Sequence, residues 1–461
     1  MIKGIVAAGT LSVMVLAAAP AAATSPAAAA PTPAPAPVTA YVVNFVSGTV
    51  TPIHTANNTT GRPIRVGRDP GAIAITPNGS TAYLDNQSGG VIPIRLATNT
   101  PGRAIRVGGT LLGALAITPN GRTVYVAHID GNTVTPIRVA TNTAGRAIKA
   151  GPIPGDIEIT PDGQTAYVAD IGANTVTPIR VATNTPERPV RVASSPFAIA
   201  ITPNGRTAYA LDLGGVTPIS AATNRAGRRI RVGGDTEVLA ITPNGKTVYV
   251  VNTSSNSVTP IDTATNKALP PVPVGHNPFG IAITPNGRTA YVVNAGSASV
   301  TPINTATNTA LPQIKVGPAP YGIAITPNGK VAYVTVRNAF GRPSFGTVTP
   351  VRIATNQAFP PISVGHNPIA VAITPDGRTA YVVNGNSHSV TPIRIATDTA
   401  LPPISVGRSP YGIAVSPDSR TVYVANMLSG TVTPIRTATN TALKPIKTGK
   451  YPEGVTIARL P

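Results

Sequence analysis

The chain is 461 residues long and contains no cysteine and no tryptophan, but 50 prolines and 44 glycines. The lack of cysteine excludes disulfide bonds, thiolate metal sites and a cysteine nucleophile. Its 36 Lys and Arg against 16 Asp and Glu give a formal net charge of +20, which favours anionic partners unless the charge only solvates a repeated surface whose consensus carries arginine.

The N-terminal segment has the composition of an export signal followed by a spacer. Residues 1–23 are interpreted as a signal peptide, with a charged start at Lys3, an apolar core over 5–16 and a small-residue cleavage site at 21–23. That core is shorter than the roughly 20 residues of a transmembrane helix. Residues 24–37 form a Pro/Ala-rich linker, and no later segment is apolar for long enough to span a membrane. We therefore expect a secreted, extracytoplasmic protein that is associated with the cell wall.

Residues 38–461 repeat one sequence unit. The phrase ITPNGRTAYVVN at 283–294 returns as ITPNGRTVYVAH at 117–128 and as ITPDGRTAYVVN at 373–384. A tyrosine in the strand after the PNG turn marks ten copies, at Tyr41, Tyr83, Tyr125, Tyr167, Tyr209, Tyr249, Tyr291, Tyr333, Tyr381 and Tyr423. Most copies are 42 residues apart, and a period of about 40–45 residues is typical of the blades of a β-propeller.

Each unit contains four short predicted strands. In the copy that starts at Gly280 they are GIAIT (280–284), RTAYVVN (288–294), SVTPI (299–303) and LPQIKVG (311–317). Val, Ile, Thr and Tyr dominate these segments, and Pro, Asn and Gly separate them. The PNG and PDG triplets predict tight hairpin turns in which glycine takes a positive φ. The fold class is therefore all-β: a propeller of four-stranded antiparallel blades.

Two features of the repeat make further predictions. VTPI places a proline inside the third strand, as at Pro136 and Pro302, so we expect an irregularity there that recurs around the ring. The segment TAYVVN (39–44) matches a second strand and GVTIA (454–458) matches a first strand. We expect these two segments to share a blade and close one ten-bladed ring. The alternative is two smaller rings, each closed midway along the chain.

The repeat resembles the YVTN-type β-propeller repeats. The nearest copies are SPDSRTVYVAN (416–426) and VTPIDTATNKALPPVPVGHNPFGIAITPNG (258–287), and the similarity extends over residues 39–458. The chain departs from the pattern in the proline of VTPI and in its number of copies. The resemblance is to secreted or surface-associated bacterial proteins and implies a binding or envelope-associated role. It supplies no catalytic motif.

The candidate site is predicted from departures within the repeat. By analogy with other propellers, the loops before the first strand and after the second strand form the ligand face. One loop position on that face carries a basic residue in four consecutive blades, and an insertion at 337–346 brings further cations and aromatics to the same arc. The predicted ligand-binding residues are Arg68, His276, Phe279, Tyr321, Arg337, Phe340, Arg342, Phe345, His366, Arg408, Tyr411 and Lys450.

Arginine among aromatic side chains suits anionic, partly planar ligands, which include unstacked nucleotides. The alternative is that these groups are solvated loop decoration, with the aromatics packed against neighbouring loops. The opposite face carries its own basic set in the PNG turns, which is spread around the ring and suits diffuse attraction to an acidic matrix. Its members are Arg122, Arg206, Lys246, Arg288, Lys330, Arg378 and Arg420.

Acidic residues provide the remaining candidates. Asp156 and Glu158 alternate in one first strand, where they predict a hard-cation site, an acid/base pair, or carboxylates that are hydrated or paired with arginine. Glu237 and His276 on adjacent blades are the strongest candidates for catalysis, but no third partner or nucleophile motif accompanies them. Asp85, Asp170, Asp212 and the Asn of YVVN are expected to tie down the loops that follow their strands.

These observations favour an exported, non-enzymatic binding or scaffold protein of the cell envelope. Its expected partner is an anionic envelope polymer or a surface protein, with nucleic acid as a further candidate because of the basic charge. We expect a monomer without a membrane span, a cofactor or a metal ion. The alternative function is a secreted lactonase-like or lyase-like propeller enzyme with its site at the channel mouth.

Overall fold

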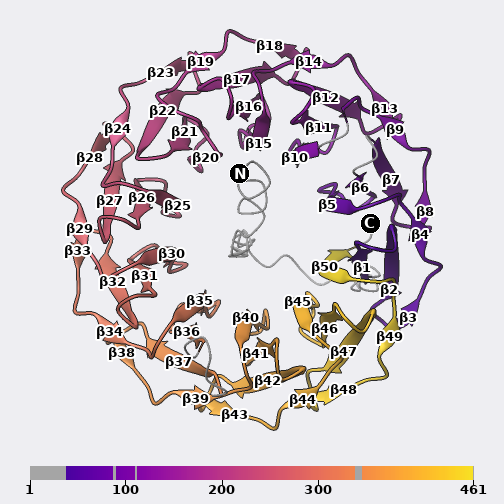
Figure 1. Cartoon of the computed structure of the whole chain (residues 1–461), viewed down its shortest axis with the longest axis vertical. Coiled ribbons are helices and arrows are strands. Elements are labelled where there is room, and N and C mark those ends of the chain that lie inside the picture. Colours follow the sequence, from indigo (N-terminus) through magenta and orange to yellow (C-terminus); the bar gives the residue numbers. More distant parts are fainter. Residues whose placement is uncertain (1–37, 87–89, 110–111, 338–344, 460–461) are drawn as a thin grey trace, which may run out of the picture.

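Ten four-stranded antiparallel sheets follow one another around a single ring (Figure 1). The computed structural model describes residues 38–86, 90–109, 112–337 and 345–459. The predicted signal peptide and linker lie outside these ranges. We number the blades 1 to 10 in ring order, so that blade 1 contains the N-terminal strand β1 and blade 10 contains β45 to β49.

Three strands of each blade run from the centre of the ring outward. The innermost strands are β5 (Pro70–Ile75), β10 (Leu112–Ile117), β15 (Pro154–Ile159), β20 (Ala198–Ile201), β25 (Thr236–Ile241), β30 (Pro278–Ile283), β35 (Pro320–Ile325), β40 (Pro368–Ile373), β45 (Pro410–Val415) and β50 (Pro452–Arg459). The second strands are β1 (Val38–Asn44), β6 (Thr81–Asn86), β11 (Thr123–His128), β16 (Thr165–Asp170), β21 (Thr207–Asp212), β26 (Thr247–Asn252), β31 (Thr289–Asn294), β36 (Val331–Val336), β41 (Thr379–Asn384) and β46 (Thr421–Asn426). The third strands are β2 (Thr49–His54), β7 (Gly90–Arg95), β12 (Thr133–Arg138), β17 (Thr175–Arg180), β22 (Gly215–Ser220), β27 (Ser257–Asp262), β32 (Ser299–Asn304), β37 (Thr347–Arg352), β42 (Ser389–Arg394) and β47 (Thr431–Arg436).

The fourth, outermost strand of every blade is split into two short segments that both pair with the third strand. These segments are β3 (Thr59–Thr60) and β4 (Ile64–Arg65), β8 (Thr100–Pro101) and β9 (Ile105–Arg106), β13 (Thr143–Ala144) and β14 (Ile148–Lys149), β18 (Thr185–Pro186) and β19 (Val190–Arg191), β23 (Arg225–Ala226) and β24 (Ile230–Arg231), β28 (Lys267–Ala268) and β29 (Val272–Pro273), β33 (Thr309–Ala310) and β34 (Ile314–Lys315), β38 (Gln357–Ala358) and β39 (Ile362–Ser363), β43 (Thr399–Ala400) and β44 (Ile404–Ser405), and β48 (Thr441–Ala442) and β49 (Ile446–Lys447).

The proline of the third strand causes this split. In blade 3 the carbonyl of Pro136 accepts a hydrogen bond of 2.7 Å from the amide of Gly145, so the backbone of Pro136 faces the outer strand. A strand residue directs its N–H and its C=O to the same side, and proline has no N–H to donate. Regular pairing therefore stops opposite Pro136, between β13 and β14. The predicted irregularity is confirmed, and it recurs in all ten blades.

The two ends of the chain close the ring through a shared blade. Strand β50 pairs antiparallel with β1, with Tyr41 opposite Thr456. This confirms the predicted closure of one ten-bladed ring, and the two-ring alternative is wrong. At the same seam, the hydroxyl of Tyr423 in blade 10 donates a hydrogen bond of 2.6 Å to Asn58 in blade 1.

The same contact joins every pair of neighbouring blades. The tyrosine of each second strand is fully buried, and its hydroxyl donates to a side-chain oxygen in the turn between the third and fourth strands of the next blade. The ten hydrogen bonds are 2.5 to 2.8 Å long. Each acceptor residue has a positive φ, which Asn and Asp tolerate better than most residues. These hydrogen bonds satisfy ten phenols that burial would otherwise leave unpaired.

Side chains become more exposed from the second strand of each blade toward the ring axis. Second-strand residues are almost all buried, whereas residues of the innermost strands are mostly half-buried or exposed. Figure 1 shows the innermost strands bordering the centre of the ring.

Among the described residues, no helix is long and apolar enough to cross a membrane.

Candidate functional site

Two sets of loops come together on one face of the ring, which we call the mouth face. They are the loops that lead into the innermost strands and the loops between the second and third strands. The amides of Gly296, Asn386 and Leu428 in the second set donate to carbonyls of His276, His366 and Arg408 in the first set. The predicted assignment of these loops to one face is thereby confirmed.

The predicted basic positions stand on a fixed backbone. The amides of His366 and Arg408 each donate a hydrogen bond of 2.6 Å to a serine Oγ in the loop between the second and third strands of the same blade. The amide of Lys450 makes the equivalent bond to Ser47 in blade 1, and that of His276 makes it to Ser297 in blade 7.

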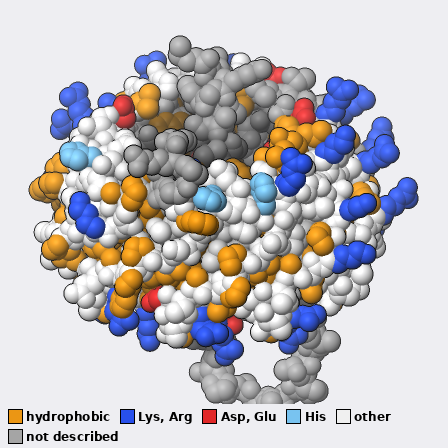
Figure 2. All heavy atoms as spheres, turned by 60° about the horizontal axis from the view of Figure 1, so that its bottom comes forward, with side chains coloured by type: hydrophobic (Ala, Val, Ile, Leu, Met, Phe, Trp, Pro, Cys, Tyr) orange, Lys and Arg blue, Asp and Glu red, His pale blue; other side chains and the backbone are white. Residues whose placement is uncertain are grey.

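The side chains of this basic arc project from blades 9, 10, 1 and 2. Arg68, Arg408 and Lys450 are exposed, and His366 is half-buried. Two carboxylates lie close in sequence to this arc. Asp69 follows Arg68, and Glu453 is three residues after Lys450, in β50. Burial raises the pKa of Glu453. Figure 2 shows Lys and Arg side chains projecting around the ring, with few acidic side chains among them.

The aromatic residues of the predicted site form two packed groups. The guanidinium carbon of Arg337 lies 3.2 Å from the centre of the Tyr321 ring, and Phe279 of the preceding blade contacts the same tyrosine with ring centres 6.0 Å apart. Phe345 stacks on His366 of the next blade, with ring centres 4.6 Å apart and planes at 19°. These contacts fit the alternative that the aromatics pack against neighbouring loops.

Three predicted residues are in neither of those groups as far as the structure describes them. Tyr411 is 47% exposed at the start of β45, so its ring is available to a ligand. Phe340 and Arg342 lie outside the described residues, so their part in the site remains a prediction. The structure thus divides the described members of the set into a basic arc, exposed except at His366, and an aromatic region in which Arg337 and Tyr321 already contact each other.

Asp156 and Glu158 lie on the innermost strand of blade 4. Both point toward blade 5, because they are paired in register with Ala169 and Tyr167, whose side chains pack against that blade. Asp156 Oδ2 accepts a hydrogen bond of 2.8 Å from the amide of Ile199 in β20, and burial raises its pKa. Glu158 is accessible at the inner edge of the blade. The protein around it removes part of its hydration, and with the negative charge of Asp156 this raises its pKa to about 7.

The other acidic predictions have different outcomes. Within the described residues, no group of three His, Cys, Asp or Glu could hold a metal ion. The side chain of Glu237 is outside the described part of the structure, so its proposed pairing with His276 remains a prediction.

The polar residues that end the second strands mostly bind the third strand, beyond the loop that they were expected to hold. Asp170 Oδ2 accepts hydrogen bonds from Thr175 and Thr177 in β17, and the Asn of YVVN donates to the same positions, as Asn294 does to Thr301. Asp212 instead binds Arg229. Asp85 is one residue earlier in its strand and contacts the backbone of β5 rather than the following loop. Burial raises the pKa of Asp85 to about 6, although backbone amides of β5 oppose the shift.

Sequence reasoning missed two cavities away from the mouth face. One, of 840 Å³, lies in blades 8 to 10, between the turns that join the first and second strands and the turns that join the third and fourth strands. Its lining includes Lys330, Arg378, Arg394 and Arg420. It concentrates part of the basic set that we expected to be diffuse. Asp376 and Asp418 lie 3.9 Å from Arg378 and Arg420, which offsets some of its charge.

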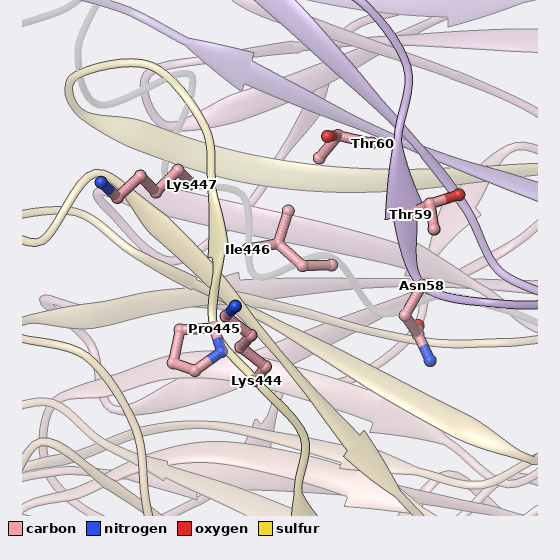
Figure 3. A pocket seen from close by; sticks show the side chains of 7 residues that line it. All are labelled: Asn58, Thr59, Thr60, Lys444, Pro445, Ile446 and Lys447. Atoms are coloured by element: carbon pink, nitrogen blue, oxygen red, sulfur yellow. The ribbon is translucent and has the colours of Figure 1, made fainter.

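The second cavity, of 340 Å³, lies at the outer seam between blades 10 and 1. Figure 3 shows its lining side chains from two segments, with Lys444 and Lys447 on one and Asn58 and Thr59 on the other. Asn58 is also the acceptor for Tyr423 at this seam. The seam is one of ten with the same strand arrangement, so only the residues that line it distinguish it.

Comparisons with known proteins agree with the fold. No protein-family model matches the sequence, and no curated protein matches it. A solved structure described as the eukaryotic initiation factor is 11% identical, covers 92% of this chain and 99% of its own, and has a TM-score of 0.62. The dihydro-heme d1 dehydrogenase NirN in complex with DHE is 15% identical, covers 71% and 73%, and has a TM-score of 0.51. Hydrazine synthase of Kuenenia stuttgartiensis is 20% identical, covers 72% and 97%, and has a TM-score of 0.39.

At 11% and 15% identity, the likeness to the first two of these structures concerns the fold alone. The chain is a β-propeller repeat protein with ten blades and a closed ring.

Proposed function

We propose that the chain is an exported propeller of the YVTN type that binds an anionic component of the cell envelope through its mouth face. The observation that carries the proposal is the basic arc, in which His366, Arg408, Lys450 and Arg68 occupy equivalent positions in four consecutive blades. At the first three of these positions a serine hydroxyl holds the backbone amide. The YVTN assignment and the export rest on the sequence motifs alone.

An extended anionic ligand fits this arrangement better than a compact one. Each cation on its own contributes little, because an exposed ion pair contributes only about 0.2–1 kcal/mol. Several cations in successive blades can engage successive charges of one ligand, and their contributions then combine without further loss of translational freedom. Because the backbone beneath them is already fixed, less conformational entropy is lost on binding.

The test is a titration of the purified protein with isolated anionic envelope polymers, single-stranded nucleic acid and a neutral polysaccharide at several salt concentrations. The variant Arg408→Ala/Lys450→Ala should weaken binding of the anionic ligand about tenfold at low salt. For a single-stranded polyanion, the slope of log K against log salt should fall by roughly 1.4, since two contacts are lost.

A matched control has the same change in net charge on the opposite face. Arg378→Ala/Arg420→Ala removes two exposed cations from the 840 Å³ cavity and should leave binding unchanged. Equal weakening by both variants would show that the charge acts diffusely and would overturn the proposal. Weakening by the control alone would move the site to the opposite face.

A further inference from the structure

Exposed hydrophobic side chains gather on one face of the ring. Among the described residues, every exposed large hydrophobic side chain lies in a loop or strand end of the mouth face; they are Val46, Leu213, Phe345, Tyr411, Leu428 and Tyr451. Single apolar residues scattered over a surface are ordinary. A restriction to one face, with four of the six on adjacent blades 10 and 1, is a pattern that needs a cause.

In these two blades the apolar residues and the cations lie on neighbouring loops that hydrogen bond to each other. In blade 10 the amide of Leu428 donates to the carbonyl of Arg408 over 3.2 Å. In blade 1 the amide of Phe45 donates to the carbonyl of Tyr451 over 3.0 Å, and the amide of Lys450 donates to Ser47.

We call this set the amphiphilic arc; it comprises Tyr411, Arg408 and Leu428 of blade 10 and Val46, Lys450 and Tyr451 of blade 1. The hydrogen bonds hold each cation beside aliphatic and aromatic side chains that stay in solvent. The arc can therefore present positive charge and apolar surface to the same partner.

The chemistry of this arc selects among anionic ligands. A hydrated polysaccharide offers its charges to Arg408 and Lys450 but gives aliphatic side chains such as Leu428 no apolar environment. The interface of a lipid bilayer offers both, because phosphate groups lie directly above acyl chains and tyrosine rings are enriched at the level of the headgroups. Basic residues near an anionic leaflet are attracted to it, and the net charge of +20 extends this attraction over a longer range.

We infer that the amphiphilic arc docks on the surface of an anionic phospholipid bilayer, with Val46 and Leu428 entering the interface and Arg408 and Lys450 binding headgroup phosphates. The inference rests on the proposed function, since it names the anionic component as a lipid surface. The protein would be peripheral and held reversibly, with the ring lying on its mouth face.

The absence of tryptophan from the chain permits a direct test with the full protein. Leu428→Trp places one indole at the tip of blade 10, where Leu428 is 50% exposed. Leu213→Trp places one at a tip of blade 5, outside the arc, where Leu213 is 63% exposed. On addition of vesicles of phosphatidylcholine and phosphatidylglycerol, emission of the first variant should shift to the blue and that of the second should not. Vesicles of phosphatidylcholine alone should shift neither.

A second variant separates lipid binding from polyanion binding. Val46→Ser/Leu428→Ser keeps all charges, so co-sedimentation with anionic vesicles should fall about tenfold while binding of a soluble polyanion is unchanged. Binding of the soluble polyanion without binding of vesicles would overturn the lipid inference and leave the proposed function standing.

Three other outcomes would also overturn the inference. Failure to bind either ligand would overturn both proposals. Self-association of the wild-type protein in sedimentation velocity, abolished by Val46→Ser/Leu428→Ser, would assign the arc to a second copy of the chain instead. An equal blue shift of both tryptophan variants would show contact outside the arc.

Discussion

The hydroxyl of Tyr333 donates a hydrogen bond of 2.5 Å to Oδ1 of Asp398 in the next blade. The other nine blades make the same contact to an asparagine, so this seam alone places a carboxylate opposite the phenol. Burial raises the pKa of Tyr333, and the carboxylate of Asp398 raises it further.

The seam hydrogen bond gives the first prediction. Asp398→Asn should change the free energy of unfolding by less than about 0.5 kcal/mol, because it restores the pair found elsewhere in the ring. Tyr333→Phe should lower it by about 0.5–1.5 kcal/mol, because a buried hydrogen bond is lost. Denaturant unfolding monitored by circular dichroism measures both, with Tyr381→Phe as the control at an Asn seam. A neutral Tyr333→Phe would contradict the proposed role of the contact.

Glu158 gives a prediction about pH. Its pKa is raised from 4.5 to about 7, so the folded protein binds the proton more tightly than the unfolded chain does. The contribution of this group to stability is therefore fully present below pH about 4.5 and is lost as pH rises through about 7. Glu158→Gln cannot ionise, and its melting temperature should fall less than that of the wild type between pH 5 and 8.

The control for Glu158 is Asp85, a second carboxyl group with a raised pKa, whose variant Asp85→Asn should act over a lower pH range, since burial brings its pKa only to about 6. Calorimetry at a series of pH values distinguishes the two variants. The same slope for wild type and Glu158→Gln above pH 6 would exclude Glu158 as a source of the pH dependence.

The turn glycines give a prediction about backbone geometry. Gly287 has φ +69°, and a Cβ there would lie 3.3 Å from Cδ of Pro243 in the neighbouring blade. Gly287→Ala should lower the free energy of unfolding by about 1–2 kcal/mol, because an L-residue is strained in this conformation. Gly280→Ala is a suitable control, since no atom lies within 4 Å of a Cβ at that position. Equal effects of the two substitutions in thermal unfolding would count against the strain argument.

The serine beneath the basic arc gives a prediction about binding. Ser429 accepts the amide hydrogen bond of Arg408 and carries no charge. Ser429→Ala should weaken the binding of an anionic ligand by about two- to fivefold, because the backbone that carries Arg408 is then less well ordered before binding. Ser297 holds His276 in the same way but lies outside the arc, so Ser297→Ala should leave affinity unchanged in isothermal titration calorimetry. An unchanged affinity of Ser429→Ala would show that the charge alone suffices.

Much of the candidate site could be placed from the sequence, but its contacts could not. Counting along the repeat put His366, Arg408, Lys450 and Arg68 on successive blades because the period is regular. The repeat could not show that Arg337 lies against Tyr321, because no other unit has an arginine at the position of Arg337. Nor could it show that Leu428 and Val46 project into solvent, since exposure depends on what neighbouring loops cover.

Whether the ten repeats close as one ring or as two was decided by the tertiary structure. The sequence by itself determined the order of the strands and the positions of the turns in each repeat. These depend on short-range rules: alternation of side chains along a strand, glycine where φ is positive, and proline where a donor is missing, as at Pro136. Only the tertiary structure decided which side chains meet across a seam, such as Tyr333 and Asp398, and how partial loss of hydration, with the charge of Asp156, raises the pKa of Glu158. The first relationship joins residues of different blades, and the second depends on what packs around β15. The packing of the ring, rather than any local pattern, sets both the distance and the solvation.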